Sequence, residues 1–157
     1  MSNLIFAVAK GRVIELYSRV EEEAGSPAGF SVSLYKNQED GLLLRARRTL
    51  AEVVANNPEC DFTNYSRKYF DNTHLDPLPE PDDHTPSRFV TFPQVLWEAA
   101  GGTTNNTIIG CVISYHPNLS LLSDNEAIPL LAFHLSVTTA GSGVLVQFHE
   151  TATYTVT

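Results

Sequence analysis

The segment TIIGCVISY, residues 107–115, constrains the fold of this chain more than any other stretch. Its residues are almost all apolar or β-favouring, and no charged side chain interrupts them. A strand with one solvent-exposed face alternates apolar and polar residues, so a run of this kind is typical of a strand covered on both faces. His116-Pro117-Asn118 then ends the run. The sequence therefore predicts a central, buried strand over residues 107–115.

Further strand patterns crowd the second half of the chain. Residues 128–139 and 143–150 have strand character, residues 151–157 are also β-favouring, and residues 89–98 predict an irregular or edge strand broken at Pro93. Short strands at close spacing are typical of an antiparallel β-sandwich or a barrel-like domain. The 157 residues contain no internal repeat and no linker, so we expect a single domain over residues 1–157.

Helices are the minor component. Within residues 10–23, four apolar side chains recur at helical spacing and predict an N-terminal amphipathic helix: Val13, Leu16, Tyr17 and Val20. A second, short helix near residues 50–56 is predicted because Thr49 and Glu52 have the spacing of a capping box. A half-buried strand at 30–35 and an aromatic-rich strand at 61–70 complete the first half. The expected fold class is mainly β, with a small α component.

A tight turn at Gly141-Ser142 predicts how the last strands pair. Glycine suits the first central position of a two-residue hairpin turn. In that register Val137 faces Val146 and Leu135 faces Phe148, whereas His134 faces His149 on the opposite side. A slip of one residue would place the apolar pairs on the polar face, so the pattern favours this register.

Two segments are expected to reach away from the domain. Residues 1–9 include a short apolar run and predict an arm in which Leu4, Ile5 and Phe6 add a strand to the sheet edge of a partner. Residues 71–88 hold four of the nine prolines, which excludes a long helix or a central strand. We expect an extended surface loop here, with three prolines as candidate partner contacts: Pro77, Pro79 and Pro81.

The charge of the chain limits its partners. Ten lysines and arginines against eighteen acidic residues give a formal net charge of −8. Such a chain repels phosphate backbones and anionic lipid surfaces, so neither a nucleic acid nor a membrane is an expected partner. Two cysteines without a disulfide framework favour synthesis in a reducing compartment, the cytoplasm.

No segment has the pattern of a catalytic or cofactor site. Cys111 lies within an apolar strand, and Cys60 precedes Asp61, whose charge disfavours a thiolate. No serine lies in a nucleophile elbow. Gly101-Gly102 precedes a strand, without the lysine or the helix N-terminus that a phosphate loop uses, so these glycines predict a turn. We expect no enzyme activity and no cofactor.

The histidines give one weak candidate site. In the predicted hairpin, His134 and His149 share a face, but no third histidine or cysteine joins them, so we expect no metal ion there. A partly exposed polar face explains the pattern, and a pH-sensitive contact between subunits is the alternative, because two protonated rings would repel each other. The other candidate, Asp82-Asp83-His84, lacks the glycine and the distal glutamate of a calcium loop.

Four segments in order carry a family resemblance. They are AKGRVIELYSRV (9–20), DFTNYSRK (61–68), WEAAGGTTNNTI (97–108) and IPLLAFHLSVTTAGSG (128–143). Together they resemble a family of small virion structural proteins of tailed bacteriophages. Its members share an Ala-Lys-Gly-Arg-Val opening, a Thr-Asn-Tyr-x-Arg-Lys segment, a Trp followed by Ala-Gly-Gly, and an Ile-Pro-Leu strand that ends in Thr-Thr-x-Gly-Ser. The resemblance spans nearly the whole chain.

The resemblance implies a component of the phage particle, made in the host cytoplasm and located in the virion. The expected role is a capsid cement, or decoration, protein that forms a homo-oligomer, with a trimer favoured, and binds the major capsid protein. One alternative is a tail or baseplate adaptor or a short fibre. Another is a receptor- or glycan-binding β domain that uses exposed aromatic residues such as Tyr65, Tyr69 or Trp97.

Overall fold

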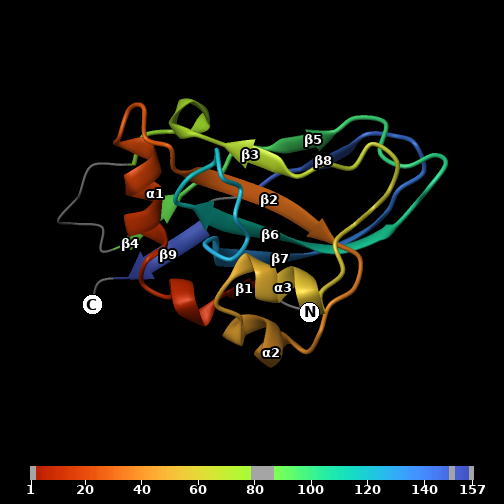
Figure 1. The fold of residues 1–157 in the computed structure, drawn as a ribbon, viewed down its shortest axis with the longest axis horizontal. Helices are drawn as coiled ribbons and strands as arrows, with labels where there is room; N and C mark the ends of the chain where they lie inside the picture. Colours follow the sequence, from red (N-terminus) through yellow and green to blue (C-terminus); the bar gives the residue numbers. More distant parts are fainter. Residues whose placement is uncertain (1–2, 79–86, 149–150, 156–157) are drawn as a thin grey trace.

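The structure is a computed structural model that describes residues 3–78, 87–148 and 151–155 of the chain (Figure 1). Within these residues the fold is mainly β, as expected. The elements in chain order are β1 (Leu4–Ile5), the 3-10 helix η1 (Ala7–Ala9), α1 (Val13–Glu21), β2 (Gly29–Tyr35), α2 (Gly41–Ala46), α3 (Leu50–Asn56), β3 (Lys68–Phe70), the 3-10 helix η2 (Asn72–His74), β4 (Ser87–Val90), β5 (Val95–Trp97), β6 (Thr107–His116), β7 (Ile128–Thr138), β8 (Val144–Val146) and β9 (Thr151–Thr155).

The main sheet has the strand order β1-β7-β6-β2-β3, and every pair in it is antiparallel. Strand β6 lies in the middle, between β7 and β2, and its residues from Gly110 to His116 are buried. The expectation of a central, buried strand at 107–115 is therefore confirmed. Two smaller antiparallel pairs, β4–β9 and β5–β8, accompany the main sheet in the described part of the chain.

The core lies between the main sheet and the smaller pairs. Phe30 of β2 packs edge-on against Phe92, which follows β4, and stacks with Tyr17 of α1. Phe148 contacts Phe92 on one side and Phe133 of β7 on the other. Aromatic side chains from both layers thus fill one continuous core, as in a β-sandwich.

The first helix matches its prediction. The apolar residues of the pattern in α1, from Val13 to Val20, are all buried, and Glu15 and Arg19 form an ion pair on the exposed side. The helix ends at Glu21, one residue into the acidic run of residues 21–23. Negative charge is unfavourable at a helix C-terminus, which explains this early end.

Capping determines where the other two helices begin. Thr49 Oγ1 accepts a hydrogen bond from Glu52 N at 3.2 Å, which confirms the predicted start of α3. Helix α2 was missed because residues 37–41 have the composition of a turn. The residue that marks the start of α2 is Asp40, which precedes a leucine-rich run. Its carboxylate accepts a hydrogen bond from Leu42 N at 2.9 Å.

Strand β2 is buried on both faces, so the expectation of a half-buried strand is wrong. The side chain of Leu119 lies against Gly29, on the face of the main sheet that also carries Ser31. Residues 118–127 therefore cover that face, and α3 is joined to them by a hydrogen bond from Leu50 N to Ala127 O at 3.0 Å. The face that carries Ser31 is thus covered in part by Leu119, a residue about ninety positions later in the chain, which no local pattern reveals.

Two further expectations are corrected. In the stretch 61–70 only Lys68–Phe70 forms a strand. The predicted hairpin register is also wrong, because Val137 pairs with Ile108 in the main sheet and Val146 pairs with Val95 in the small one. Gly141 does make a left-handed turn, with a φ of 94°. However, the chain leaves the main sheet at that turn instead of folding back along β7.

No helix in the described residues is long and apolar enough to cross a lipid bilayer.

Candidate functional site

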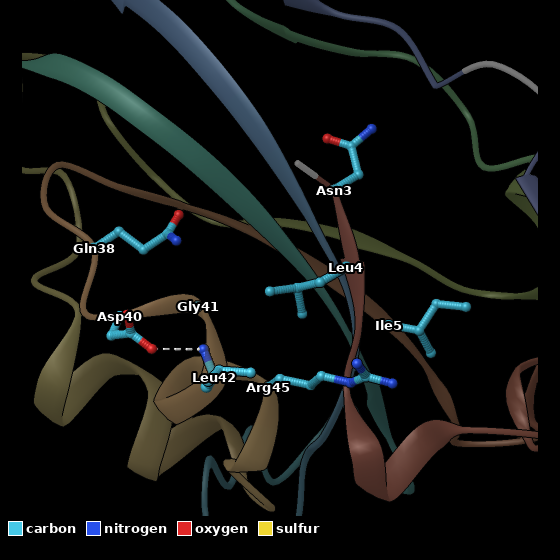
Figure 2. Close-up of a pocket in the computed structure, with 8 residues that line it drawn as sticks. All are labelled: Asn3, Leu4, Ile5, Gln38, Asp40, Gly41, Leu42 and Arg45. Atoms are coloured by element: carbon cyan, nitrogen blue, oxygen red, sulfur yellow. Dashed lines mark hydrogen bonds between the residues drawn. The ribbon is translucent and has the colours of Figure 1, made fainter. Parts of the chain in front are cut away.

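A groove of about 550 Å³ opens between β1 and α2 (Figure 2). We call it the edge groove. Its lining comes from two parts of the chain that are far apart in sequence: Asn3, Leu4, Ile5, Gln38, Asp40, Gly41, Leu42 and Arg45. Figure 2 shows the β1 residues on one side and the α2 residues on the other, with the Arg45 side chain extending toward β1.

The β1 side of the edge groove is an edge of the main sheet. Leu4 pairs with Ala132 and Ile5 with Leu131, both in β7. Among the described residues, no strand pairs with the other side of β1. An uncovered strand edge presents backbone donors and acceptors that an extended segment of another chain can pair with.

The α2 side of the edge groove combines a buried anchor with exposed apolar residues. Leu44 is fully buried and holds the helix against the domain. Leu42, which lines the groove, is 78% exposed, and its neighbour Leu43, which lies outside the lining, is 56% exposed. Burial of a leucine side chain away from water is favourable by about 1.5–3 kcal/mol. Two adjacent leucines that stay exposed are therefore typical of a surface that contacts another molecule.

Charged side chains of both signs surround the edge groove. Arg47 pairs with Glu39 at 2.6 Å, and this hydrogen bond lowers the pKa of the Glu39 carboxyl. Asp40 caps α2. By contrast, neither Arg45 nor Arg48 forms an ion pair within the part of the chain that the structure describes, and Arg48 lines a neighbouring hollow of about 410 Å³ with Ala7, Val8 and Ala46. The lining of the edge groove therefore holds one acidic and one basic side chain, Asp40 and Arg45.

The three residues of the predicted arm differ in burial. Leu4 and Ile5 are half-buried and line the edge groove. Phe6 is fully buried in the chain's own core, and its backbone N–H donates to Leu130 O at 3.0 Å. The expectation that residues 1–9 add a strand to another chain is corrected, because the strand they contain completes the chain's own sheet. Phe6 is therefore a core residue and not a partner contact.

Of the three prolines predicted as partner contacts, only Pro77 lies within the described residues. Pro77 is exposed. It follows Asp76, whose carbonyl accepts a hydrogen bond from Tyr17 Oη on α1 at 2.7 Å, and it does not line the edge groove. Pro79 and Pro81 lie outside the described residues, as does Asp82-Asp83-His84.

Of the two histidines in the predicted pair, only His134 lies within the described residues. His134 is exposed on β7, pairs with Gly110 of β6, and donates its backbone N–H to Asn3 Oδ1 at 3.0 Å, beside the edge groove. His149 lies outside the described residues. The hairpin register that supported a His134–His149 contact is not formed, so the pH-sensitive pair remains a prediction without that support.

A different histidine is buried. His116, at the end of β6, is 1% exposed, and its Nε2 lies 2.8 Å from Ser31 Oγ. Its Nδ1 and the nearby Ser114 Oγ have no hydrogen-bond partner within the described residues. Burial lowers the pKa of His116, so the ring is neutral at pH 7. The sequence reading missed it because His116-Pro117-Asn118 has the composition of a strand end.

This histidine and its serine do not form a catalytic pair. Ser31 is fully buried beneath the sheet surface, so a substrate cannot reach its hydroxyl. The charge of Asp124 acts on the ring, but its carboxylate is paired with Arg67 at 2.7 Å. In the part of the chain that the structure describes, Nδ1 of His116 therefore has no carboxylate partner of the kind that orients the base of a hydrolytic triad.

Cys111 matches its prediction as a buried thiol, and Cys60 is buried as well. Cys60 and Cys111 are both buried and free. Desolvation raises the pKa of each thiol to about 12, so neither is a thiolate at neutral pH. The described residues contain no group of three or more His, Cys, Asp or Glu side chains placed to hold a metal ion.

The aromatic residues proposed for glycan binding are engaged within the protein. Trp97 is buried, and its Nε1 donates to Ser66 O at 2.7 Å. Tyr65 stacks on Trp97 and donates its hydroxyl to Glu59 Oε1 at 2.6 Å. Tyr69 contacts the His116 ring. Of the three, Trp97 is buried, so its ring is not accessible to a sugar, whereas Tyr65 and Tyr69 are half-buried.

Loops from three of the resemblance segments are joined by hydrogen bonds. We call this region the loop junction (residues 61–66, 97–107 and 138–142). Asn106 connects all three loops. Its Oδ1 accepts from Asp61 N at 2.7 Å, its backbone N–H donates to Thr139 Oγ1 at 2.9 Å, and it lies within the glycine-rich loop itself. The turn at Gly141 is fixed to the same loop by a bond from its N–H to Ala100 O at 2.7 Å.

The two glycines in the loop junction confirm the prediction of a turn. Gly101 and Gly102 have φ values of 89° and 104°, a left-handed region that glycine enters without strain. Asn105 Oδ1 accepts a hydrogen bond from Gly102 N at 2.8 Å, which closes the loop just before β6 begins at Thr107.

Comparison of the chain with models of known protein families, with characterised protein sequences and with solved structures finds no match.

Proposed function

We propose that this chain is a structural protein of a tailed-phage particle, most specifically a capsid cement protein that binds the major capsid protein. The observation that carries the proposal is the ordered set of four sequence segments that resemble small virion proteins. Three of these segments are the loops of the loop junction, joined by hydrogen bonds through Asn106, Thr139 and Ala100. These three segments are therefore parts of one hydrogen-bonded unit of the fold.

The edge groove supplies the kind of surface that a cement protein needs. Among the described residues it offers an open strand edge at Leu4 and Ile5, the exposed Leu42 of α2, and the Arg45 side chain. A protein that occupies hundreds of lattice sites can attach through a small surface, because symmetric oligomers bind through several copies at once. In this proposal the homotrimer supplies that multivalency.

The number of copies per particle tests the proposal. Quantitative mass spectrometry of purified particles from the phage that encodes this chain should find hundreds of copies. Tens of copies or fewer would place the chain in the tail or baseplate instead, and absence from particles would contradict a virion role. Native mass spectrometry of the purified protein measures its oligomeric state, for which we expect a trimer.

Position in a particle density map is the sharper test. The chain should lie on the outer surface of the capsid, with the β1 edge of the main sheet facing the shell. Density for the chain at the tail, or with β1 facing solvent, would contradict the cement role or the assigned attachment surface, respectively.

A further inference from the structure

We propose that residues 117–123, which we call the strap, open locally when His116 is protonated and expose the polar groups beneath them to water. This inference goes beyond the proposed function and does not rest on it. The strap follows β6 directly and lies outside every helix and strand of the described structure. In Figure 1 it belongs to the cyan loop that passes across β2 and β6. A short, irregular segment thus covers this part of the main sheet.

The strap is weakly attached to the sheet. Among the described residues, one backbone hydrogen bond joins it to a distant segment, from Leu119 N to Pro27 O at 2.7 Å. The Leu119 side chain lies against Gly29 of β2. The other two leucines of the strap, Leu121 and Leu122, are exposed, and Leu122 has a φ of 47°, a left-handed conformation that is strained for a leucine. Segments with so few buried contacts open at a lower free energy than the core of a domain.

The chain is fixed again directly after the strap. The carbonyl of Asp124 accepts a hydrogen bond from Ala51 N at 3.0 Å, which attaches it to α3. Its carboxylate is paired with Arg67 at 2.7 Å. Movement is therefore confined to the residues between His116 and Asp124, and the strands on either side can stay paired while the strap opens.

His116 lies beneath the strap. It is opposite Gly29 of β2, so its side chain shares the sheet face on which Leu119 packs. Its Nε2 lies 2.8 Å from Ser31 Oγ, and Ser114 is opposite Ser31 on the same face. Within the described residues, His116 Nδ1 and Ser114 Oγ have no hydrogen-bond partner. Burial of such atoms is unfavourable, and an open strap would let water bind to both.

A positive charge on His116 is unfavourable while the strap is closed. Both ring nitrogens of the protonated form are donors, and Nδ1 meets no acceptor in the described part of the chain. The charges of Asp124 and Arg67 act on the ring with opposite signs and are paired with each other. Tyr69 of β3 and Ser31 of β2 are its uncharged neighbours. Burial accordingly lowers the pKa of His116.

The sign of the pH effect follows from this difference between the two states. In the open state the ring has the ordinary histidine pKa near 6.5, so the open state binds the proton more readily than the closed state. The closed strap is therefore favoured above about pH 6.5 and loses this preference as the pH falls below it. Each pH unit over which only the open state is protonated favours opening by up to about tenfold, so opening at pH 5 should be about ten- to thirtyfold more populated than at pH 7.5.

Amide hydrogen exchange, resolved by residue with NMR, tests the opening in the full-length protein. Protection factors at pH 7.5 and pH 5, each corrected for the intrinsic exchange rate at that pH, are compared for Leu119 and for Val112 in the middle of β6. Leu119 should be at least about tenfold less protected than Val112 and insensitive to low concentrations of urea, because local opening exposes little surface. Its protection should fall about ten- to thirtyfold at pH 5. Equal protection and urea dependence of the two amides, or no pH effect at Leu119, overturns the proposal.

Two measurements identify His116 as the titrating group. In His116→Gln the protection of Leu119 should change less than about twofold between the two pH values, whereas His134→Gln, at an exposed ring, should keep the wild-type response. An NMR titration of the His116 ring in the unsubstituted protein needs no variant. The ring signal and the Leu119 protection should change over the same pH range, and protonation of the ring without loss of protection overturns the proposal.

A matched pair of leucine variants tests whether the strap is held through Leu119. At pH 7.5, Leu119→Ala should make the amide of residue 119 exchange about fivefold faster or more, because it removes the apolar contact with β2. Leu121→Ala changes an exposed side chain of the same strap and should alter that rate less than about twofold. Equal effects of the two variants would show that Leu119 does not hold the strap closed, and the proposal would fail.

Discussion

At the scale of single residues, the most demanding position is Gly101. It combines a φ of +89° with surroundings that leave no room for a methyl group, since a Cβ there would lie 2.2 Å from Asn105 Oδ1 and 2.7 Å from Thr139 Oγ1. Both groups belong to the loop junction, so they cannot move without disturbing its hydrogen bonds. Backbone conformation and packing thus require glycine here for separate reasons.

Three glycine-to-alanine variants separate these reasons. Gly101→Ala should lower the free energy of unfolding by about 2–4 kcal/mol, through strain and overlap together. Gly25→Ala, at φ +80° with open space around it, should cost only about 1–2 kcal/mol of strain. Gly41→Ala, at the start of α2 with neither constraint, should be neutral or stabilising by up to about 1 kcal/mol. Urea denaturation measures all three, and equal losses at positions 101 and 25 would show that the overlap is absent.

His116 predicts a pH-dependent stability. Burial lowers its pKa in the folded state, and Asp124 and Arg67 act on it with opposite signs. Tyr69 and Ser31 are its neutral neighbours. The unfolded chain, with a histidine pKa near 6.5, therefore binds the proton more readily than the folded chain. Stability contributed by the neutral ring is present above about pH 6.5 and is lost as the pH falls below it.

Denaturation at two pH values checks this sign. The free energy of unfolding should fall between pH 7.5 and pH 5, by up to about 1.4 kcal/mol for each pH unit over which only the unfolded state is protonated. His116→Gln should reduce this pH dependence, whatever its effect on stability at pH 7.5. His134→Gln, which changes an exposed ring, is the control and should preserve it. An unchanged pH dependence in His116→Gln would assign the effect to other groups.

At the scale of elements, the N-terminal strand is part of the fold. Phe6 is fully buried directly after β1, whereas Leu4 is half-buried at the edge groove. Phe6→Ala should therefore cost about 3–5 kcal/mol of unfolding free energy, and Leu4→Ala less than about 1.5 kcal/mol. Thermal or urea unfolding compares the two. Similar small losses would mean that residues 1–9 form the detached arm that the sequence had suggested.

Two valine substitutions distinguish the observed strand pairing from the predicted hairpin. In the structure Val146 is 6% exposed and pairs with Val95, whereas Val137 is 41% exposed near the end of β7. Val146→Asp should lower the unfolding free energy by more than about 3 kcal/mol, because it buries a charge. Val137→Asp should cost about 1 kcal/mol or less. In the predicted hairpin the two valines face each other, so comparable losses would favour that register.

At the scale of the whole molecule, both layers share one core. Trp97, the single tryptophan, belongs to β5 in the smaller layer, but it stacks on Tyr65 and lies beneath the Lys68 ammonium of β3. Phe92 and Phe148 extend the same aromatic core to β2 and β7. The β5–β8 pair therefore has no core of its own and is not expected to unfold separately.

Two optical probes test this cooperativity. Tryptophan fluorescence reports on β5, and far-ultraviolet circular dichroism reports on the backbone of the whole molecule. Their urea transitions should coincide, with the same midpoint and slope, as expected for a two-state domain. A fluorescence transition at lower urea would show that the smaller layer detaches before the main sheet unfolds.

The sequence predicted those features that depend on neighbours along the chain. The spacing of Val13, Leu16, Tyr17 and Val20 predicted α1, the Thr49 hydroxyl predicted the start of α3, and the continuous run at 107–115 predicted the central strand. Each of these signals acts over a few residues, because helix periodicity, capping and β-branching are local effects. The same local rules identified the buried thiol of Cys111 and the turn at Gly101-Gly102.

Only the tertiary structure decided which strands pair and which surfaces meet. A local turn rule at Gly141 could not reveal that Ala100, forty-one residues earlier, binds that turn and directs the chain into the second layer. Likewise, the edge groove joins residues 3–5 to residues 38–45, and the burial of Ser31 depends on residues near 119. These contacts are long-range, so their free energy depends on the complete arrangement of the chain and leaves no pattern in any short window.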